Sequence, residues 1–126
     1  MTGRLTTRDL MAKAERASVS ARALLSLGDA DGACNRAYYA MFDAARAALL
    51  STGATIGKTH NGVLTAFSEH LVKTGHLSKE LGRMLKHAET FRYVADYEGG
   101  SVESSDAHEM VEQAEIFVAA VKEKIN

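Results

Sequence analysis

The chain has 126 residues, with 15 lysines and arginines against 16 aspartates and glutamates, and a single cysteine, Cys34. That length is typical of one domain with a sizeable core, so we expect residues 1–126 to form a single domain. The formal net charge of −1 excludes a broad basic field that would draw a whole domain onto nucleic acid or an anionic membrane, and the lone cysteine excludes an internal disulfide.

No run of about 18 apolar residues, the length needed for a membrane-spanning helix, occurs in the sequence. The charged start, MTGRLTTRDLMAKAERAS, lacks the apolar segment of a signal peptide. We therefore expect a cytoplasmic protein with no membrane association. Cys34 lies in an alanine-rich run, where we expect it to be a small buried side chain.

Apolar residues at helical spacing predict a first helix with Thr7 as its N-cap and Asp9 in its first turn, ending near Gly28. Its apolar face consists of Leu10, Ala14, Ala17, Ala21 and Leu24. A second helix is predicted from residues 29–31 to Gly53, with an apolar face of Cys34, Ala37, Tyr38, Met41, Ala45, Ala48 and Leu49. Because small residues occupy its other faces too, we expect it to be the central helix.

Three more helices follow. The third is predicted to end at Gly75 and carries Val63, Leu64, Phe67 and Leu71. The fourth is predicted to start at a Ser78 cap and stop at residues 99–100, with a stripe of Leu81, Met84, Leu85, Ala88, Phe91 and Ala95. The fifth is predicted to follow a capping box of Asp106 and Glu109, with a stripe of Met110, Ala114, Phe117, Val121 and Ile125.

This pattern predicts an all-α fold. Four long helices and one shorter one, joined by short loops, pack most simply as an up-and-down antiparallel four-helix bundle with an additional shorter helix.

Two charged residues continue the apolar stripe of the predicted fourth helix. On a helical wheel, Arg92 and Asp96 fall in the same sector as Leu81 and Leu85. Removing an ion from water costs several kcal/mol, so we expect Arg92 either to pair with Asp96 one turn later or to line a cleft. The alternative is that the stripe ends here and both side chains reach solvent near the helix C-terminus.

The second helix has a half-polar stripe beside its apolar face, formed by Asn35, Tyr39, Phe42 and Arg46. Such a stripe can line a cleft or form a homodimer interface, and ordinary boundary positions are an equal alternative.

His60 heads the predicted third helix directly after Lys58 and Thr59. A cation and an imidazole at a helix N-terminus can bind a phosphate, although a lone histidine there can also be structural. The run GKTH lacks the glycine spacing of a P-loop. The other histidines, His70, His76, His87 and His108, show no metal-binding spacing, so we expect no metal and no cofactor.

Four blocks of the sequence resemble small prokaryotic HEPN-domain proteins: NRAYYAMFDAARAALL at 35–50, GKTHNGVLTAF at 57–67, VKTGHLSKELG at 72–82 and FRYVADYEG at 91–99. The resemblance implies a helical bundle that is usually a homodimer, often encoded with a minimal nucleotidyltransferase as a toxin and antitoxin pair. It also implies that many relatives are metal-independent RNases with a signature of Arg, four to six residues, then His, often with Tyr two positions further on.

In that signature the arginine holds the scissile phosphate and the histidine moves a proton. In some pairs the nucleotidyltransferase silences the toxin by adenylylating the tyrosine. This chain departs from the signature, because the positions where the histidine would follow Arg92 hold Tyr97, Glu98 and Gly99. The tyrosine position is also Gly99, and a tyrosine such as Tyr97, with an ordinary pKa of about 10, is a poor general base at neutral pH.

Three hypotheses follow. The first is a non-catalytic or weakly active HEPN module with a polar groove around Arg92 and Asp96, with Tyr97, Lys58 and His60 as further ligand or phosphate-binding residues. That groove would bind a nucleotide, RNA or a partner nucleotidyltransferase. The second is a metal-independent ribonuclease toxin with a divergent site, with Arg92 catalytic and His60 or His108 supplying a proton from another helix. The third is a purely structural dimerisation protein.

Overall fold

The computed structural model describes residues 5–54, 56–57, 59–97 and 102–125, and these residues form helices and no strands. The helices are α1 (Thr7–Ser26), α2 (Ala30–Ser51), α3 (His60–Phe67), α4 (Lys79–Tyr97) and α5 (Ser104–Ile125), with a short π-helical segment, η1 (Ser68–Val72), directly after α3. Four helices are long and α3 is short, so the predicted all-α bundle with an additional shorter helix is confirmed.

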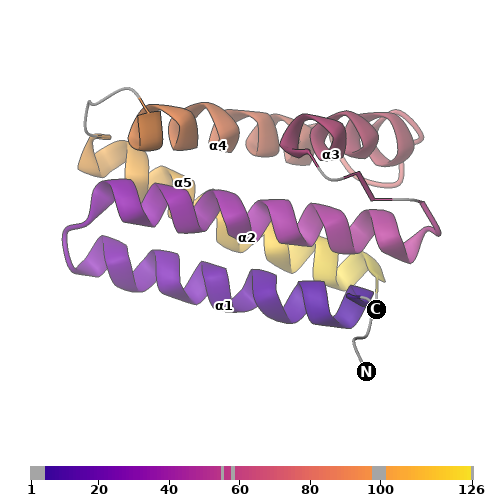
Figure 1. Cartoon of the computed structure of the whole chain (residues 1–126), viewed down its shortest axis with the longest axis horizontal. Helices are drawn as coiled ribbons and strands as arrows, with labels where there is room; N and C mark the ends of the chain where they lie inside the picture. The colour runs from indigo at the N-terminus through magenta and orange to yellow at the C-terminus, as the bar shows by residue number, and fades with distance from the viewer. Residues whose placement is uncertain (1–4, 55, 58, 98–101, 126) are drawn as a thin grey trace.

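Consecutive long helices run in opposite directions and lie side by side (Figure 1). The helix α2 lies between α1 and α4, and α5 packs across all three. The helix α2 is buried on almost every face, and many of its buried residues are alanines, among them Ala33, Ala37, Ala40, Ala44 and Ala48. Small side chains allow neighbouring backbones to approach closely, which explains how one helix contacts all the others. The prediction that this is the central helix is confirmed, and Cys34 is buried within it.

Two predicted helix starts are wrong. The N-cap of α1 is Thr6 and not Thr7: its hydroxyl accepts from the Asp9 amide at 3.0 Å, and the Asp9 carboxylate accepts from the Thr6 amide at 3.0 Å. The helix α5 starts at Ser104, so Asp106 lies in its first turn and forms no capping box with Glu109. The chain entering α5 is instead fixed by a long-range bond, in which the Val102 amide donates to Asp31 Oδ1 at 2.8 Å.

The predicted third helix is interrupted. Regular α-helix ends at Phe67, and η1 continues the chain with the wider π-helical spacing before Gly75, whose φ of +82° turns the chain back. π-Helical segments are rare and occur often at functional sites. Periodicity alone did not reveal this change of spacing, because buried Leu71 stays on the apolar side in either conformation.

Candidate functional site

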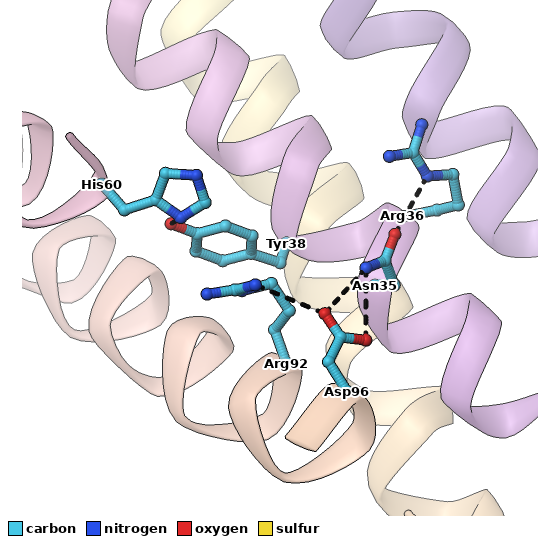
Figure 2. A network of polar contacts seen from close by, with 6 residues as sticks. All are labelled: Asn35, Arg36, Tyr38, His60, Arg92 and Asp96. Atoms are coloured by element: carbon cyan, nitrogen blue, oxygen red, sulfur yellow. Dashed lines mark hydrogen bonds and ion pairs between the residues drawn. The ribbon is translucent and has the colours of Figure 1, made fainter. Parts of the chain in front are cut away.

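The helix α4 directs a charged side chain inward at the position where its apolar stripe predicted one. The Arg92 side chain is only 11% exposed and that of Asp96 is 26% exposed. Arg92 Nη1 donates to Asp96 Oδ2 at 3.3 Å, and Asn35 Nδ2 on α2 donates to both oxygens of the same carboxylate, at 3.1 and 3.4 Å (Figure 2). The alternative in which both side chains reach open solvent is therefore wrong for Arg92, whereas Asp96 stays partly exposed to solvent.

The Arg92 guanidinium also lies against two aromatic rings, 5.0 Å from the centroid of Tyr38 and 5.7 Å from that of Tyr97. Burial lowers the pKa of Arg92, but Tyr97, Tyr39, Tyr38 and Asp96 raise it by more, so its net pKa is above the ordinary arginine value. The guanidinium is therefore a permanent, largely desolvated cation. Within the described residues, no acceptor bonds its buried Nε.

His60, at the start of α3, lies on the other side of Tyr38 (Figure 2). Its Nδ1 is 3.1 Å from the Tyr38 hydroxyl, with donor and acceptor set by the imidazole tautomer. Burial first, and then the positive charge of Arg92, lower the pKa of His60, while Glu89 opposes the change. Burial raises the pKa of Tyr38, so the phenol keeps its proton. At neutral pH we therefore expect a neutral imidazole beside a protonated phenol.

Arg92, Tyr38 and His60, together with Asn35 and Asp96, form what we call the polar cluster. Its members come from α2, α3 and α4, and the imidazole and the guanidinium face opposite sides of one buried ring (Figure 2). No single helix carries this arrangement, because it depends on α3 packing against α2, which brings His60 beside Tyr38.

The aromatic surface extends from His60 along α2. The His60 ring lies 4.5 Å from the Phe42 centroid and 5.7 Å from the Tyr39 centroid. Arg46 lies over Phe42 at 5.7 Å and pairs with Asp43 at 3.3 Å. Phe42, Arg46 and His60, with Ile56 and Gly57, line a pocket of about 320 Å³. A second arginine thus lines a pocket together with His60.

The remaining predicted residues lie at the edges. Tyr97 is 65% exposed and presents its ring to Arg92. Lys58 lies outside the described residues. His108 is on α5, half exposed and 3.6 Å from Glu112, so it is not part of the polar cluster. Within the described ranges, no three histidine, cysteine, aspartate or glutamate side chains gather in a way that could hold a metal ion.

The sequence did not predict the role of two residues in this region. Tyr38 was expected to be an ordinary core residue, and it is fully buried, yet its hydroxyl contacts His60. Arg36 was not singled out, and its guanidinium lies 5.1 Å from the Tyr39 centroid while its Nε donates to Asn35 Oδ1 at 3.4 Å. The spacing of Arg36 and Tyr39, three residues apart on one helix, was the available signal.

Chemically, the polar cluster offers a fixed positive charge and a neutral imidazole within one compact region. A guanidinium binds phosphate through paired N–H groups, and a neutral imidazole can accept a proton near neutral pH. Asp96 neutralises only part of Arg92, because one long contact at 3.3 Å leaves the other donors of the guanidinium available.

Comparison with known protein families matches residues 7–124 to the HEPN domain. The chain belongs to the HEPN family. Similar HEPN-family relatives include the UPF0332 protein glr0978 of Gloeobacter violaceus, which is 37% identical over 91% of this chain and 92% of that protein. A UPF0332 protein of Thermotoga maritima is 37% identical over 83% of this chain and 80% of that protein.

A third relative of this HEPN chain has a name that refers to function. The protein of Methanocaldococcus jannaschii named "Putative toxin MJ0142" is 32% identical over 90% of this chain and 77% of that protein. The resemblance inferred from the four sequence blocks is thus confirmed at the level of the family. In the described part of this HEPN protein, no helix combines the length and apolar character needed to cross a membrane.

Proposed function

We propose that this HEPN protein binds a phosphate-bearing ligand, an RNA or a nucleotide, at the polar cluster, and that it is the HEPN member of a toxin and antitoxin pair. The observation that carries the proposal is the position of Arg92, a permanently charged side chain that is only 11% exposed and whose buried Nε has no acceptor among the described residues. A mostly buried cation with unused hydrogen-bond donors contributes little to the stability of a fold. The same cation is well suited to bind an anion with two or three oxygen atoms, such as a carboxylate or a phosphate.

His60 supports the same proposal. Its pKa is lowered by burial and by Arg92, so the free site avoids placing two cations side by side. A bound phosphate would reverse that balance, because the anion favours the imidazolium. The cluster is therefore suited to take up a proton together with an anion, and the partly exposed Tyr39 beside His60 provides ring surface for a base.

The toxin and antitoxin role rests on the family and on the name of the Methanocaldococcus jannaschii relative. We propose that this chain, as the resemblance to HEPN proteins implies, forms a homodimer and pairs with a minimal nucleotidyltransferase. We also propose that it acts in the cytoplasm. The half-polar stripe of α2, with Asn35, Tyr39 and Arg46, is the proposed edge of the dimer contact.

Binding of ATP and of a 12-nucleotide single-stranded RNA, measured by isothermal titration calorimetry, tests the proposal. Saturable binding of one or both ligands is expected, with affinity lost at least tenfold in Arg92→Ala and partly retained in Arg92→Lys. Arg16 is an exposed arginine on α1, so Arg16→Ala is the matched control, and this variant should bind both ligands like the wild type. Wild-type protein that binds neither ligand would favour the purely structural alternative, as would binding that Arg92→Ala leaves unchanged.

A ribonuclease is the second candidate function, and one observation favours it. The histidine missing after Arg92 has a spatial counterpart in His60, whose ring lies on the opposite face of Tyr38 from the guanidinium. In this mechanism His60 would accept the 2′-hydroxyl proton as the 2′-oxygen bonds to the phosphorus, while Arg92 stabilises the charge on the phosphate. The bond from the phosphorus to the 5′-oxygen would break, leaving a 2′,3′-cyclic phosphate and a 5′-oxygen that takes a proton from water. The reaction would need no metal.

Cleavage of a labelled RNA in the presence of EDTA tests this second candidate. Activity should fall at least a hundredfold in His60→Ala and in Arg92→Ala, and should persist in His108→Ala. Intact RNA after prolonged incubation with the wild type would leave binding as the function.

A further inference from the structure

A groove separate from the polar cluster lies between η1 and the first half of α4. Its volume is about 480 Å³, within the range of sites that bind ligands or peptide side chains. Residues of α3, η1 and α4 line it, so it lies where the π-helical segment departs from regular α-helix. No part of the function proposed above requires it.

The rim of this groove is basic in a chain whose total charge is −1. Four exposed cations line it, Lys73, Lys79, Arg83 and Lys86, against two carboxylates, Glu69 and Glu89. Arg83 is paired with Glu80 at 2.6 Å. Within the part of the chain that the structure describes, no carboxylate forms an ion pair with Lys73, Lys79 or Lys86. The groove is thus a local positive region on a protein that is otherwise slightly negative.

The floor of the groove is apolar. Leu64 and Val72 are partly buried there, and Gly82 on α4 faces Val72. A Cβ at Gly82 would lie 3.3 Å from Val72 Cγ2, so the glycine keeps α4 close to η1 without filling the space between them. Apolar side chains of a partner can therefore reach the floor, while carboxylates on the same segment reach the lysines.

We propose that this groove docks an acidic amphipathic segment of a partner protein. Charge complementarity and the apolar floor both favour such a segment. A nucleic acid fits less well, because single-stranded nucleic acids bind on exposed aromatic rings and the one aromatic residue that lines the groove, Phe67, is only 1% exposed. The groove ends at Glu89, one turn before Arg92, so a bound partner would lie beside the polar cluster without covering it.

The test uses a fluorescent helical peptide with leucines at spacings of three and four and glutamates on the flanks. Fluorescence anisotropy should show saturable binding that weakens as salt is added. A peptide of the same composition in scrambled order, and a 12-nucleotide single-stranded RNA, are the comparison ligands. The variant is Lys79→Glu with Lys86→Glu, and the matched control is Arg16→Glu with Lys124→Glu, which changes the total charge equally on α1 and α5.

The double variant should weaken peptide binding at least tenfold, and the control should change it less than twofold. Hydrogen exchange should show protection by the peptide within residues 64–73 and 79–89. The proposal is overturned if the amphipathic peptide does not bind, if the scrambled peptide binds equally well, or if the RNA binds and loses its affinity in the same variant. Because none of these substitutions touches Arg92 or His60, this result is independent of the binding test at the polar cluster.

Discussion

Arg92 is the residue whose contacts should contribute most to the stability of this site. Its contact with Asp96 is long, at 3.3 Å, but Asp96 also accepts two bonds from Asn35, so the carboxylate links α4 to α2. Removing one partner of a buried ion pair costs 3–5 kcal/mol, and an exposed pair contributes less than about 1 kcal/mol. The 26% exposure of Asp96 lies between these cases.

We therefore expect Asp96→Ala to lower the free energy of unfolding by about 2 kcal/mol, because it leaves a desolvated guanidinium without its carboxylate. Urea denaturation measures the loss. Glu80→Ala, which removes the exposed partner of Arg83, is the control and should cost under about 0.5 kcal/mol. Equal, small losses in both variants would contradict the description of Arg92 as mostly buried and paired with Asp96.

His60 gives the protein a pH dependence with a defined sign. Its pKa in the folded state is lowered by burial and by Arg92, so the unfolded chain binds the proton more readily. The stability associated with neutral His60 is therefore present above the ordinary histidine pKa of about 6.5 and is lost as the pH falls below it. Between pH 7 and pH 5, His60→Gln should lose less stability than the wild type in urea denaturation. The same substitution at His70, outside the polar cluster, is the control, and an identical slope for His60→Gln and wild type would refute the prediction.

At the residue scale, the sequence predicted the inward direction of Arg92 and Asp96, because helical period alone fixes which face of α4 they share with Leu85. It did not predict that His60 lies beside Tyr38. That contact depends on how α3 packs against α2, which helical periodicity does not predict. Nor did it predict the polar role of Tyr38, since a tyrosine on an apolar face has the same pattern whether or not its hydroxyl has a partner.

Among the elements, α2 carries the largest share of the core and also a buried acid, Asp43. Burial raises the pKa of the Asp43 carboxyl, although Arg46, Lys13 and Arg36 oppose the change. A raised folded-state pKa means that the ionised carboxylate is less favourable in the fold than in the unfolded chain at neutral pH, and that this cost is relieved as the pH falls. Arg46 is the nearest cation and holds the ionised form in place.

The two members of this pair should consequently respond in opposite ways. Asp43→Asn should leave stability at pH 7 unchanged or slightly raised, because it removes the buried charge. Arg46→Ala should lower it by on the order of 2 kcal/mol, because it leaves the buried carboxylate unpaired. Thermal or urea unfolding of both variants measures the difference, and a larger loss in Asp43→Asn than in Arg46→Ala would show that the pair stabilises the fold through its charge.

Element order and element type were predictable, whereas two helix starts and the end of α3 were not. The starts failed because several residues near each one have the chemistry of a cap: Thr6 and Thr7 are adjacent, and Asp106 is two residues inside α5. The π-helical segment was not predicted because the apolar spacing in η1 is equally compatible with a regular α-helix.

For the whole molecule, the homodimer proposed above would use the half-polar stripe of α2. Analytical ultracentrifugation should show a homodimer at high micromolar concentration, weakened by Tyr39→Glu on the proposed contact and not by Arg16→Glu on α1. A monomer at every concentration would remove the dimer from the account.

The central claim is that Arg92 and His60 act together on a bound phosphate, and the most direct measurement follows the His60 imidazole itself. NMR titration of the histidine ring signals, with and without saturating ATP or the 12-nucleotide RNA, gives the pKa of His60 in both states. A bound anion should raise that pKa toward or above its ordinary value, and Arg92→Lys should reduce the change. A ligand that binds while the pKa of His60 stays lowered would contradict the claim.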